Sequence, residues 1–572
     1  MKRFAFAPML ALAACTTTTD PVVVEQAPPR STEVQLLAIN DFHGRLEAPS
    51  RSMTATLEDG SVIEVPVGGA AYLAGAMDAL DTGTSIRVAA GDLIGATPLP
   101  SALFLDEPSI EAMNILGLQY SALGNHEFDE GVEELLRIAE GGCETYTEQV
   151  PCALDGSYEG ADFLYMAANV FTEEDETLMP ATAVHDVGGR RIGFIGMPLA
   201  GTPRLVAPNR VDGLRFANEV ETANALVASL NSQGAETIVL LLHEGGYIED
   251  GGFDDCVGLS GPVADMLPVL DEAISVIVSG HSRGPYNCRV AMPSGIGERV
   301  LTHGGAYGVI VSDIRLEFGE AGFIGARAEN ILVQGDAFVD ADGRRIAPSD
   351  LLPRFAPDAE MEALVDRVVE AAAPQSRRIV GTLGGAVAGE QAGYLIADSQ
   401  FAATAAQKNG AADFAVMNPG GVRSGFVPGQ DGTITFGQAF EVQPFGNSLM
   451  TVTLTGAEIK NVFEQGIRHT EDGSFATLLR PSWQLSYAYD MSRPDGENIV
   501  WIKLNGETIS PEKEYRVTTN NFIANGGDGF TLFLEGRDRT GAGSDIDAIT
   551  AWLADGRDVP ELGRIINLTP TP

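Results

Sequence analysis

Five short apolar runs between residues 33 and 281 each lead into a side chain that can bind a metal ion. Each run is rich in β-branched residues and is bounded by glycine or a polar turn, which is typical of buried strands. Helical stretches such as EVETANALVASL lie between the runs. We therefore predict an α/β domain. The runs are VQLLAIN, IRVAA, YSAL, TIVLLL and ISVIVS, and they lead into Asp41, Asp92, Asn125, His243 and His281.

The side chains at these run ends favour a metal site. A lone histidine after a strand is more often a hydrogen-bonded structural residue, but five strand ends in one domain are hard to explain in that way. Side chains at the strand ends of one sheet meet at one edge, where α/β proteins place their ligands. Carboxylate oxygens and neutral imidazoles are ligands of zinc, manganese and iron. Asp92 is the expected bridge, because one carboxylate can give an oxygen to each of two ions.

The length of the chain and its net charge limit the classes of function that we expect. A chain of 572 residues is too long for one hydrophobic core, so we expect two or three domains. The chain has 79 acidic and 36 basic side chains, a net charge of −43. Such a surface repels phosphate backbones, so we expect no nucleic-acid binding. An anionic substrate would need local arginines or metal ions to overcome this charge.

The N-terminus is typical of an exported bacterial lipoprotein. Lys2 and Arg3 precede the apolar stretch FAFAPMLALAA, and the segment ends in LAAC, with Cys15 where lipoproteins are cut and acylated. An ordinary signal peptide with an incidental cysteine is the alternative. We predict a signal at 1–14, a lipid on Cys15 and a flexible tether at 15–32. The protein would then be periplasmic or at the cell surface, anchored to a membrane by its lipid.

Four further cysteines are expected to pair in that oxidising compartment. Cys143 and Cys152 flank a short polar loop, and Cys256 and Cys288 flank the segment that carries SGHSRGP. A metal role for the four is the alternative, but no C-x-x-C spacing supports it, so two disulfides are favoured.

A helix is expected to connect two domains. The segment PDAEMEALVDRVVEAAA at 357–373 has apolar residues at helical spacing, with proline before and after it. From residue 377 a second domain begins, which mixes strands with glycine-rich turns. The apolar positions are Met361, Leu364, Val365, Val368 and Val369.

The ordered motifs DFH, GD, GNHE, a later histidine and GHS resemble those of calcineurin-like metallophosphoesterases. Over residues 33–570 the chain is similar to the 5'-nucleotidase family, which includes UDP-sugar hydrolases and ecto-5'-nucleotidases. The resemblance implies a four-layer α/β/β/α metallophosphoesterase domain at 33–340, and a linker with a connecting helix at 341–376. It implies an α+β nucleotide-binding domain at 377–572, and two divalent metal ions such as zinc or manganese.

The resemblance also assigns roles around the metals. One ion would be held by Asp41, His43 and Asp92, and the other by Asp92, Asn125, His243 and His281. His126 would stabilise the charge that develops on the phosphoryl group, and Asp129 would orient His126. The alternative for His126 and Asp129 is a simple hydrogen bond at the start of a helix.

In the C-terminal half, NPGGVR resembles the family's N-x-G-G-x-R turn, with Asn418, Gly421 and Arg423. Its arginine would grip phosphate, and its glycines let the backbone approach closely. By the same resemblance Phe445 and Phe522 would sandwich a base, Asn447 would touch the base edge, and Asp528 would accept bonds from ribose hydroxyls. The alternative is that the two phenylalanines are only core residues.

Two departures from the family pattern concern the phosphate. Family members carry arginines shortly before a segment like GYLIAD, but here that stretch reads GGAVAGEQA, and Arg377 and Arg378 lie further upstream. After GHS the family has His, Gln or Asn, whereas this chain has Arg283, which cannot bind a metal. Arg283 could point away into solvent, which the sequence slightly favours, or reach the phosphate; His303 could replace the missing ligand. We expect weaker binding at the first metal site.

These features predict an exported phosphohydrolase that removes phosphate from 5'-nucleotides by water attack at a dinuclear metal centre. Nucleotide-sugars and 2',3'-cyclic nucleotides are competing substrates. The alternative is a nucleotide- or metal-binding lipoprotein with little catalysis.

Overall fold

The computed structural model describes residues 32–48, 51–57, 59–147, 149–249, 251–340, 343–470 and 473–570. The predicted signal and lipid-bearing Cys15 lie outside the described residues. Among those that are described, no helix has the length and apolarity needed to cross a bilayer.

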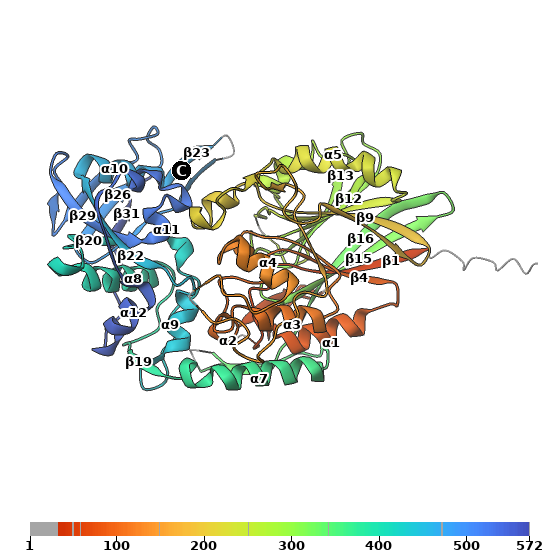
Figure 1. The fold of residues 1–572 in the computed structure, drawn as a ribbon, viewed down its shortest axis with the longest axis horizontal. Coiled ribbons are helices and arrows are strands. Elements are labelled where there is room, and N and C mark those ends of the chain that lie inside the picture. The colour runs from red at the N-terminus through yellow and green to blue at the C-terminus, as the bar shows by residue number, and fades with distance from the viewer. Residues whose placement is uncertain are drawn as a thin grey trace, which may run out of the picture.

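Two six-stranded sheets form the centre of the N-terminal half (Figure 1). They pack face to face through apolar side chains such as Leu36, Val88, Leu241 and Val276. The first sheet has the order β16-β15-β1-β4-β5-β6, and the second has the order β13-β14-β12-β11-β9-β8. The first comprises β1 (Glu33–Ile39), β4 (Ser85–Ala90), β5 (Tyr120–Ala122), β6 (Leu164–Met166), β15 (Ile310–Gly319) and β16 (Gly322–Leu332). The second comprises β8 (Thr182–Val187), β9 (Arg190–Pro198), β11 (Thr237–His243), β12 (Ile274–Ser279), β13 (Tyr286–Ala291) and β14 (Glu298–His303).

Helices cover the outer faces of both sheets. The first sheet buries Leu37, Ile39 and Ala89 against one group of helices, and the second buries Leu240 and Ile277 against another. The layers are therefore α/β/β/α, which confirms the predicted fold. The first group is α1 (Ala70–Leu80), α3 (Glu107–Ile115), α4 (Val132–Glu140) and α7 (Ala359–Ser376), and the second is α5 (Glu219–Ser232) and α6 (Pro262–Met266).

The connecting helix α7 runs beneath the N-terminal half (Figure 1). Asp358 caps its start by accepting a bond from the Met361 N–H, and Met361, Leu364 and Val368 are buried. The sequence places its end before Pro374, yet the helix continues to Ser376. Pro374 removes one backbone donor in the last turn only, and the Arg377 N–H still bonds to a carbonyl one turn back.

The C-terminal half mixes strands and helices, as predicted for an α+β fold. A five-stranded sheet has the order β25-β20-β29-β22-β30, and a four-stranded sheet has the order β28-β27-β26-β31. The first comprises β20 (Phe414–Met417), β22 (Ser448–Thr455), β25 (Arg480–Pro481), β29 (Glu514–Asn520) and β30 (Arg537–Ser544). The second comprises β26 (Leu485–Tyr489), β27 (Ile499–Leu504), β28 (Glu507–Thr508) and β31 (Ile565–Asn567). The longer helices are α8 (Gly389–Thr404), α10 (Gly456–Gln465) and α12 (Asp545–Ala554).

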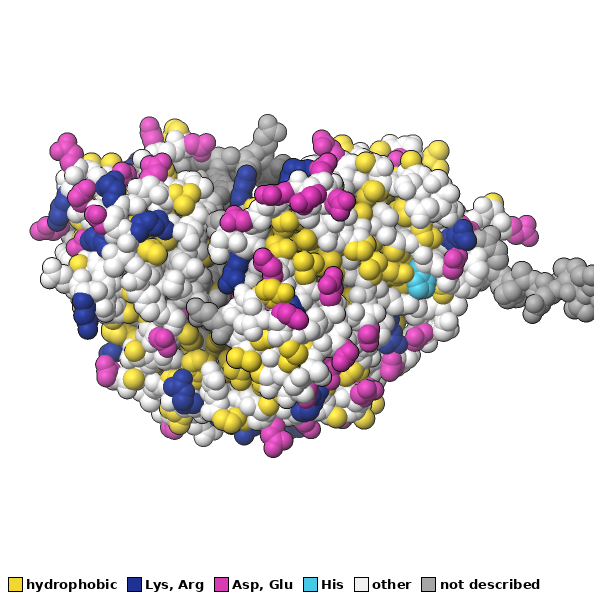
Figure 2. Space-filling view, viewed as in Figure 1, with side chains coloured by type: hydrophobic (Ala, Val, Ile, Leu, Met, Phe, Trp, Pro, Cys, Tyr) yellow, Lys and Arg dark blue, Asp and Glu magenta, His cyan; other side chains and the backbone are white. Residues whose placement is uncertain are grey.

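Both predicted disulfides are present. Cys143 pairs with Cys152, and Cys256 pairs with Cys288. The second bond ties a loop after β11 to β13, directly after the SGHSRGP segment. Acidic side chains are spread over the face shown in Figure 2, in keeping with the net charge of −43.

Candidate active site

The carboxyl ends of strands from both sheets meet at one edge of the N-terminal half. We expected the donor residues to lie at the ends of one sheet, and this is wrong. β1, β4 and β5 are parallel neighbours in the first sheet, while β11 and β12 are parallel neighbours in the second. Because β4 packs against β11 and β12 across the interface, the ends of both groups reach the same place.

Asp92 lies at the centre of the donor residues. Its Oδ2 is 3.0 Å from Nε2 of His243 and 3.5 Å from Nε2 of His43. Asp41 Oδ1 lies 3.9 Å from the same His43 nitrogen. Asp92, His243 and His281 each offer a donor atom within 4.8 Å of the others. The geometry allows Asp92 to serve two adjacent ions.

Backbone carbonyls orient two of the histidines. Nδ1 of His43 donates to the Gly95 carbonyl at 2.8 Å, and Nδ1 of His243 donates to the Ala90 carbonyl at 2.7 Å. Each ring therefore presents the lone pair of its Nε2 to the centre, as in metal-binding histidines whose second nitrogen is hydrogen bonded.

The donor set fits divalent metal ions. Three buried atoms at the centre have no hydrogen-bond partner within the part of the chain that the structure describes: Asp41 Oδ1, His43 Nε2 and Asn125 Oδ1. Buried polar atoms without partners cost free energy, so a native protein leaves few of them. Oxygen and imidazole donors at one point are the coordination that zinc or manganese takes.

The loops that carry these donors are held by neighbours. The Asp41 carboxylate accepts bonds from the Asn40 amide at 2.7 Å and from the His281 N–H at 3.0 Å. Gly280 lies so close to His243 that a Cβ there would be 2.8 Å from its Nδ1. Only glycine allows this approach.

Glu127 is a positioning residue that sequence reasoning missed. Its buried carboxylate accepts the N–H groups of Asp92 at 3.0 Å, Leu93 at 2.8 Å and Gly124 at 2.6 Å. It thereby joins the loop after β4 to the loop after β5. The GNHE motif contained this glutamate and could have indicated its role.

His126 lies beside the donors and is paired with Asp129. Its Nδ1 is 2.7 Å from Asp129 Oδ2, and its backbone N–H donates to Asp92 Oδ1 at 2.9 Å. Burial alone lowers the pKa of His126, but the charges of Asp129 and Asp92 and the hydrogen bond outweigh it and raise the pKa to about 9. Asp129 therefore occupies Nδ1 of His126, which leaves Nε2 as the ring nitrogen available to a substrate.

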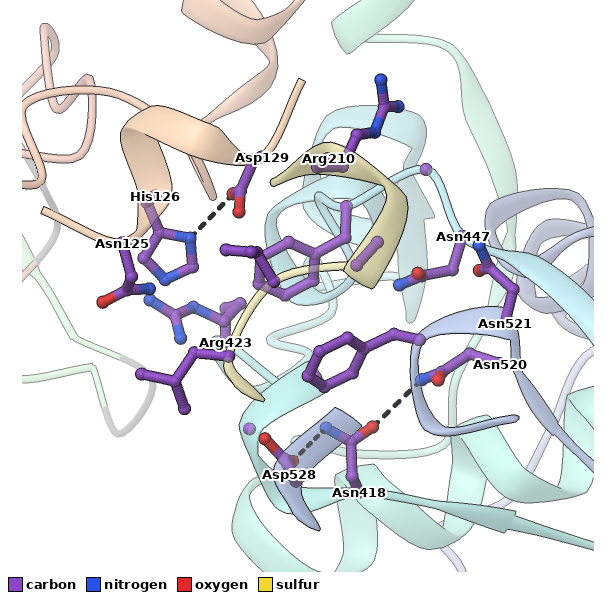
Figure 3. Close-up of a pocket in the computed structure, with 18 of the residues that line it drawn as sticks. Asn125, His126, Asp129, Arg210, Asn418, Arg423, Asn447, Asn520, Asn521 and Asp528 are labelled. Carbon is purple, nitrogen blue, oxygen red and sulfur yellow. Dashed lines mark hydrogen bonds and ion pairs between the residues drawn. The ribbon is translucent and has the colours of Figure 1, made fainter. Parts of the chain in front are cut away.

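A cavity of about 340 Å³ lies between the two halves and opens onto these residues (Figure 3). Figure 3 shows Asn125 and His126 on one side and Asn447, Asn520 and Asn521 on the other. The N-terminal half contributes Asp92, Asn125, His126, Asp129, Leu205, Val206, Ala207, Asn209, Arg210, His281 and Arg283. The C-terminal half contributes Asn418, Gly420, Gly421, Arg423, Phe445, Gly446, Asn447, Asn520, Asn521, Phe522 and Asp528.

Every residue predicted to bind substrate lines this cavity. The Phe445 ring is stacked on the His126 ring, with centroids 5.8 Å apart and planes 16° apart. The Arg423 guanidinium lies 5.5 Å from the centre of the Phe445 ring. Phe445 therefore contacts the residues expected to handle phosphate as well as the space expected to hold a base.

Asn418 directly follows β20, and its side-chain amide is hydrogen bonded to two other residues that line the cavity. Its amide donates to Asp528 at 2.7 Å, and its oxygen accepts from the Asn520 amide at 3.0 Å. Asn418 thus holds Asp528 at the cavity wall. A Cβ on Gly421 would lie 2.4 Å from the Met417 side chain, which explains the glycine in the turn.

Comparison with known proteins points to one family. The family model described as "5'-nucleotidase, C-terminal domain" matches residues 382–535. A 5'-nucleotidase precursor from Thermus thermophilus has a structure with a TM-score of 0.73 and 26% identity, covering 94% of this chain and 99% of that one. An NAD 5'-nucleotidase of Haemophilus influenzae is 25% identical over 563 residues, 88% of this chain and 86% of that protein. A cell wall protein of Listeria monocytogenes is 28% identical over 93% of this chain and 68% of its own length.

Over most of its length the chain is similar to 5'-nucleotidases, and residues 382–535 match the C-terminal domain of that family.

The sequence departs from the family pattern in two places, and the structure shows where the residues concerned lie. The α8 helix begins at Gly389 without an arginine ahead of it, and neither Arg377 nor Arg378 lines the cavity. Arg378 packs on the Phe436 ring instead, at 4.7 Å. The upstream arginines therefore do not replace those of the family.

Arg283 lines the cavity together with Arg423. The sequence slightly favoured a position in solvent, and this is wrong. The Arg283 backbone has a φ of 63°, in the left-handed region that non-glycine residues seldom adopt. Burial is the main cause of the lowered pKa of His281, about 3, and the charge of Arg283 is among the further contributions.

His303, considered as a replacement ligand, makes contacts within the protein. Its Nδ1 accepts the Gly305 N–H at 3.0 Å, and its ring packs 5.2 Å from that of Tyr286. The candidate metal-donor groups among the described residues do not include it. Sequence reasoning also missed the wall formed by Leu205, Val206, Ala207, Asn209 and Arg210, for which no motif gave a signal.

Proposed function

We propose that this protein is a metal-dependent phosphohydrolase that removes phosphate from 5'-nucleotides. The observation that carries the proposal is a single cavity whose lining combines three of the proposed metal donors and His126 from the N-terminal half with Phe445, Phe522 and Arg423 from the C-terminal half. The similarity to 5'-nucleotidases supports the same reaction class.

One ion would be held by Asp41, His43 and Asp92, and a second by Asp92, Asn125, His243 and His281. When bound, two zinc or manganese ions would activate a water molecule and offset the charge of the phosphate. The unpartnered buried donor atoms support this assignment.

The side chains around the metals would bind and stabilise the phosphoryl group. Arg423 has Nε and Nη2 buried without a hydrogen-bond partner in the described part of the chain, so both can donate to phosphate oxygens. His126 would donate its Nε2–H to a phosphoryl or leaving-group oxygen, while Asp129 holds the proton on Nδ1.

The C-terminal wall would bind the nucleoside. Stacking of a base between Phe445 and Phe522 would contribute about 1–3 kcal/mol and tolerate different bases. Asn447 would contact the base edge, and Asp528 would accept bonds from the ribose hydroxyls. Nucleotide-sugars and 2',3'-cyclic nucleotides carry the same nucleoside and are further candidate substrates.

We also propose export and anchoring by a lipid on Cys15, with the division into domains at 33–340 and 377–572 joined by the linker at 341–376. The two disulfides support export, because such bonds persist in oxidising compartments.

The test compares phosphate release from 5'-AMP, ribose 5-phosphate, 2',3'-cyclic AMP and a nucleotide-sugar in the presence of manganese. We expect 5'-AMP to exceed ribose 5-phosphate, because only the nucleotide has a base to stack. Arg423→Ala should lower the rate, while Arg289→Ala, which removes the same charge from an exposed position on β13, should not. A folded protein that releases phosphate from none of them would favour the alternative of a binding lipoprotein.

A further inference from the structure

The SGHSRGP loop between β12 and β13 is fixed at both ends. On one side the Gly280 N–H bonds to the Leu242 carbonyl at 3.0 Å, and the His281 N–H bonds to Asp41 at 3.0 Å. On the other side, the Tyr286 hydroxyl lies 2.8 Å from Ser279 Oγ, and the disulfide at Cys288 follows directly. The backbone on both sides of Arg283 is therefore held by the fold.

The backbone of this loop is strained at His281 and Arg283, both of which line the cavity. His281 and Arg283 have φ values of 70° and 63°. Left-handed backbone at non-glycine residues costs free energy and persists where surrounding structure or function requires it. Here the result is a guanidinium on the wall that also holds Asp92, His126 and His281.

Arg283 has no hydrogen bond or ion pair in the part of the chain that the structure describes. This is unusual in a protein with 79 acidic and 36 basic side chains, where a carboxylate partner is easily found. Arg423, across the same cavity, also leaves two buried nitrogens without partners there. Two arginines without carboxylate partners, one from each half of the chain, face one space.

One alternative is that the positive charge of the Arg283 side chain takes the place of the first metal ion. The geometry argues against this, because Asp41 Oδ1, a donor of the first set, has no hydrogen-bond partner in the described residues and accepts nothing from Arg283. Metal ions at Asp41 and Asp92 would instead place further positive charge near Arg283. An anion bound between the metal ions and Arg283 would offset the repulsion between these positive charges.

We infer that Arg283 and Arg423, one from each half of the chain, both bind the phosphate in this cavity, and that Arg283 leaves the first metal site with three protein ligands. The inference rests on the proposed function and names its preferred substrate class, a terminal phosphate with two negative charges. Two arginines and two divalent ions stabilise a dianionic monoester more than the singly charged phosphate of a cyclic diester.

The test uses Arg283→Asn and Arg283→Lys. Asparagine tolerates left-handed backbone better than most residues, so the loss of the guanidinium can be studied in a folded protein. Lysine keeps the positive charge but lacks the two parallel N–H donors of a guanidinium group. Arg289→Ala is the control, since its side chain is 59% exposed on β13 and its loss changes the net charge by the same amount.

Three measurements on the manganese-saturated protein are needed. Orthophosphate affinity by calorimetry should fall about 10- to 100-fold in Arg283→Asn and less in Arg283→Lys, with Arg289→Ala unchanged. The ratio of kcat/KM for 5'-AMP over 2',3'-cyclic AMP should fall in Arg283→Asn. Manganese affinity at the weaker site should rise, because asparagine offers an oxygen ligand. Unchanged orthophosphate affinity in Arg283→Asn would overturn the inference.

The outcomes separate this inference from the proposed function. If the protein hydrolyses 5'-AMP and the Arg283 variants bind orthophosphate as before, only the inference fails. If the protein hydrolyses no nucleotide but its orthophosphate binding depends on Arg283, the phosphate grip stands and the proposed function fails.

Discussion

The ring of Phe445 lies stacked on the ring of His126, with centroids 5.8 Å apart and planes inclined by 16°. The two residues come from different halves of the chain, more than 300 positions apart. The C-terminal half therefore contacts the imidazole directly, and the nucleoside-binding wall and the metal edge form one cavity.

Phe445→Ala should weaken nucleotide binding selectively. Loss of one aromatic face removes about 1–3 kcal/mol of base stacking, so KM for 5'-AMP should rise about 5- to 150-fold. Steady-state kinetics with ribose 5-phosphate provide the control, because that substrate has no base. An equal loss with both substrates would show that Phe445 acts through His126 and not on the base.

His126→Ala should lower kcat by about 10²- to 10⁴-fold while the protein keeps its metal. The reason is that His126 donates to the phosphoryl group but is not among the metal ligands we propose. Metal content by elemental analysis is measured beside turnover. Asp129→Asn, which keeps the shape but weakens the hold on Nδ1, should give a smaller loss. A His126→Ala protein with unaltered turnover would support a binding protein instead.

The two metal sites should differ in affinity. Calorimetric titration of the metal-free protein with manganese should resolve a tighter and a weaker site, because the first set lacks the ligand that Arg283 replaces. His43→Ala should abolish the weaker step and His243→Ala the tighter one. Equal affinity at both sites of the unmodified protein would refute this expectation.

Asp545 should make stability depend on pH. It lies at the start of α12, it is 1% exposed, and its N–H donates to the Asn447 carbonyl at 2.8 Å. Burial raises the pKa of its carboxyl to about 7, against bonds from the Ile546 N–H and the Asn447 amide that lower it. Between about pH 4 and 7 the native state therefore holds a proton that the unfolded chain has released, and stability falls as pH rises through this range.

Asp545→Asn cannot ionise, so it should raise the free energy of unfolding at pH 8 by up to about 4 kcal/mol and change it little near pH 4. Urea unfolding at pH 4, 6 and 8 measures this. Asp547→Asn, at an exposed position in the same turn, serves as control. A gain of equal size at all three pH values would contradict the assignment to Asp545.

The donors of the metal site could be predicted because each stands in a local pattern. Asp92 and His243 follow apolar runs whose lengths and β-branched residues identify strands, and the end of a parallel strand is a known position for ligands. The disulfides could be predicted for a similar reason, since few cysteines leave few pairings. In these cases the information lies within a few residues of the site.

Other features depend on contacts that no local pattern contains. An apolar run in the sequence does not show which sheet its strand joins. The contact of β4 with β11 and β12 was therefore not predicted. The position of Arg283 at the cavity depends on tertiary contacts that hold the backbone on both sides of it. The cavity wall from Leu205 to Arg210 is brought to the site by tertiary packing alone.

The most direct test of the account is phosphate release from 5'-AMP by metal-stripped protein, titrated first with manganese and then with zinc. We predict no turnover without metal and turnover that rises as the sites fill, because the buried donors at Asp92 need ions to neutralise the phosphate. A folded protein that releases no phosphate at any metal concentration, or that turns over equally without metal, would contradict it.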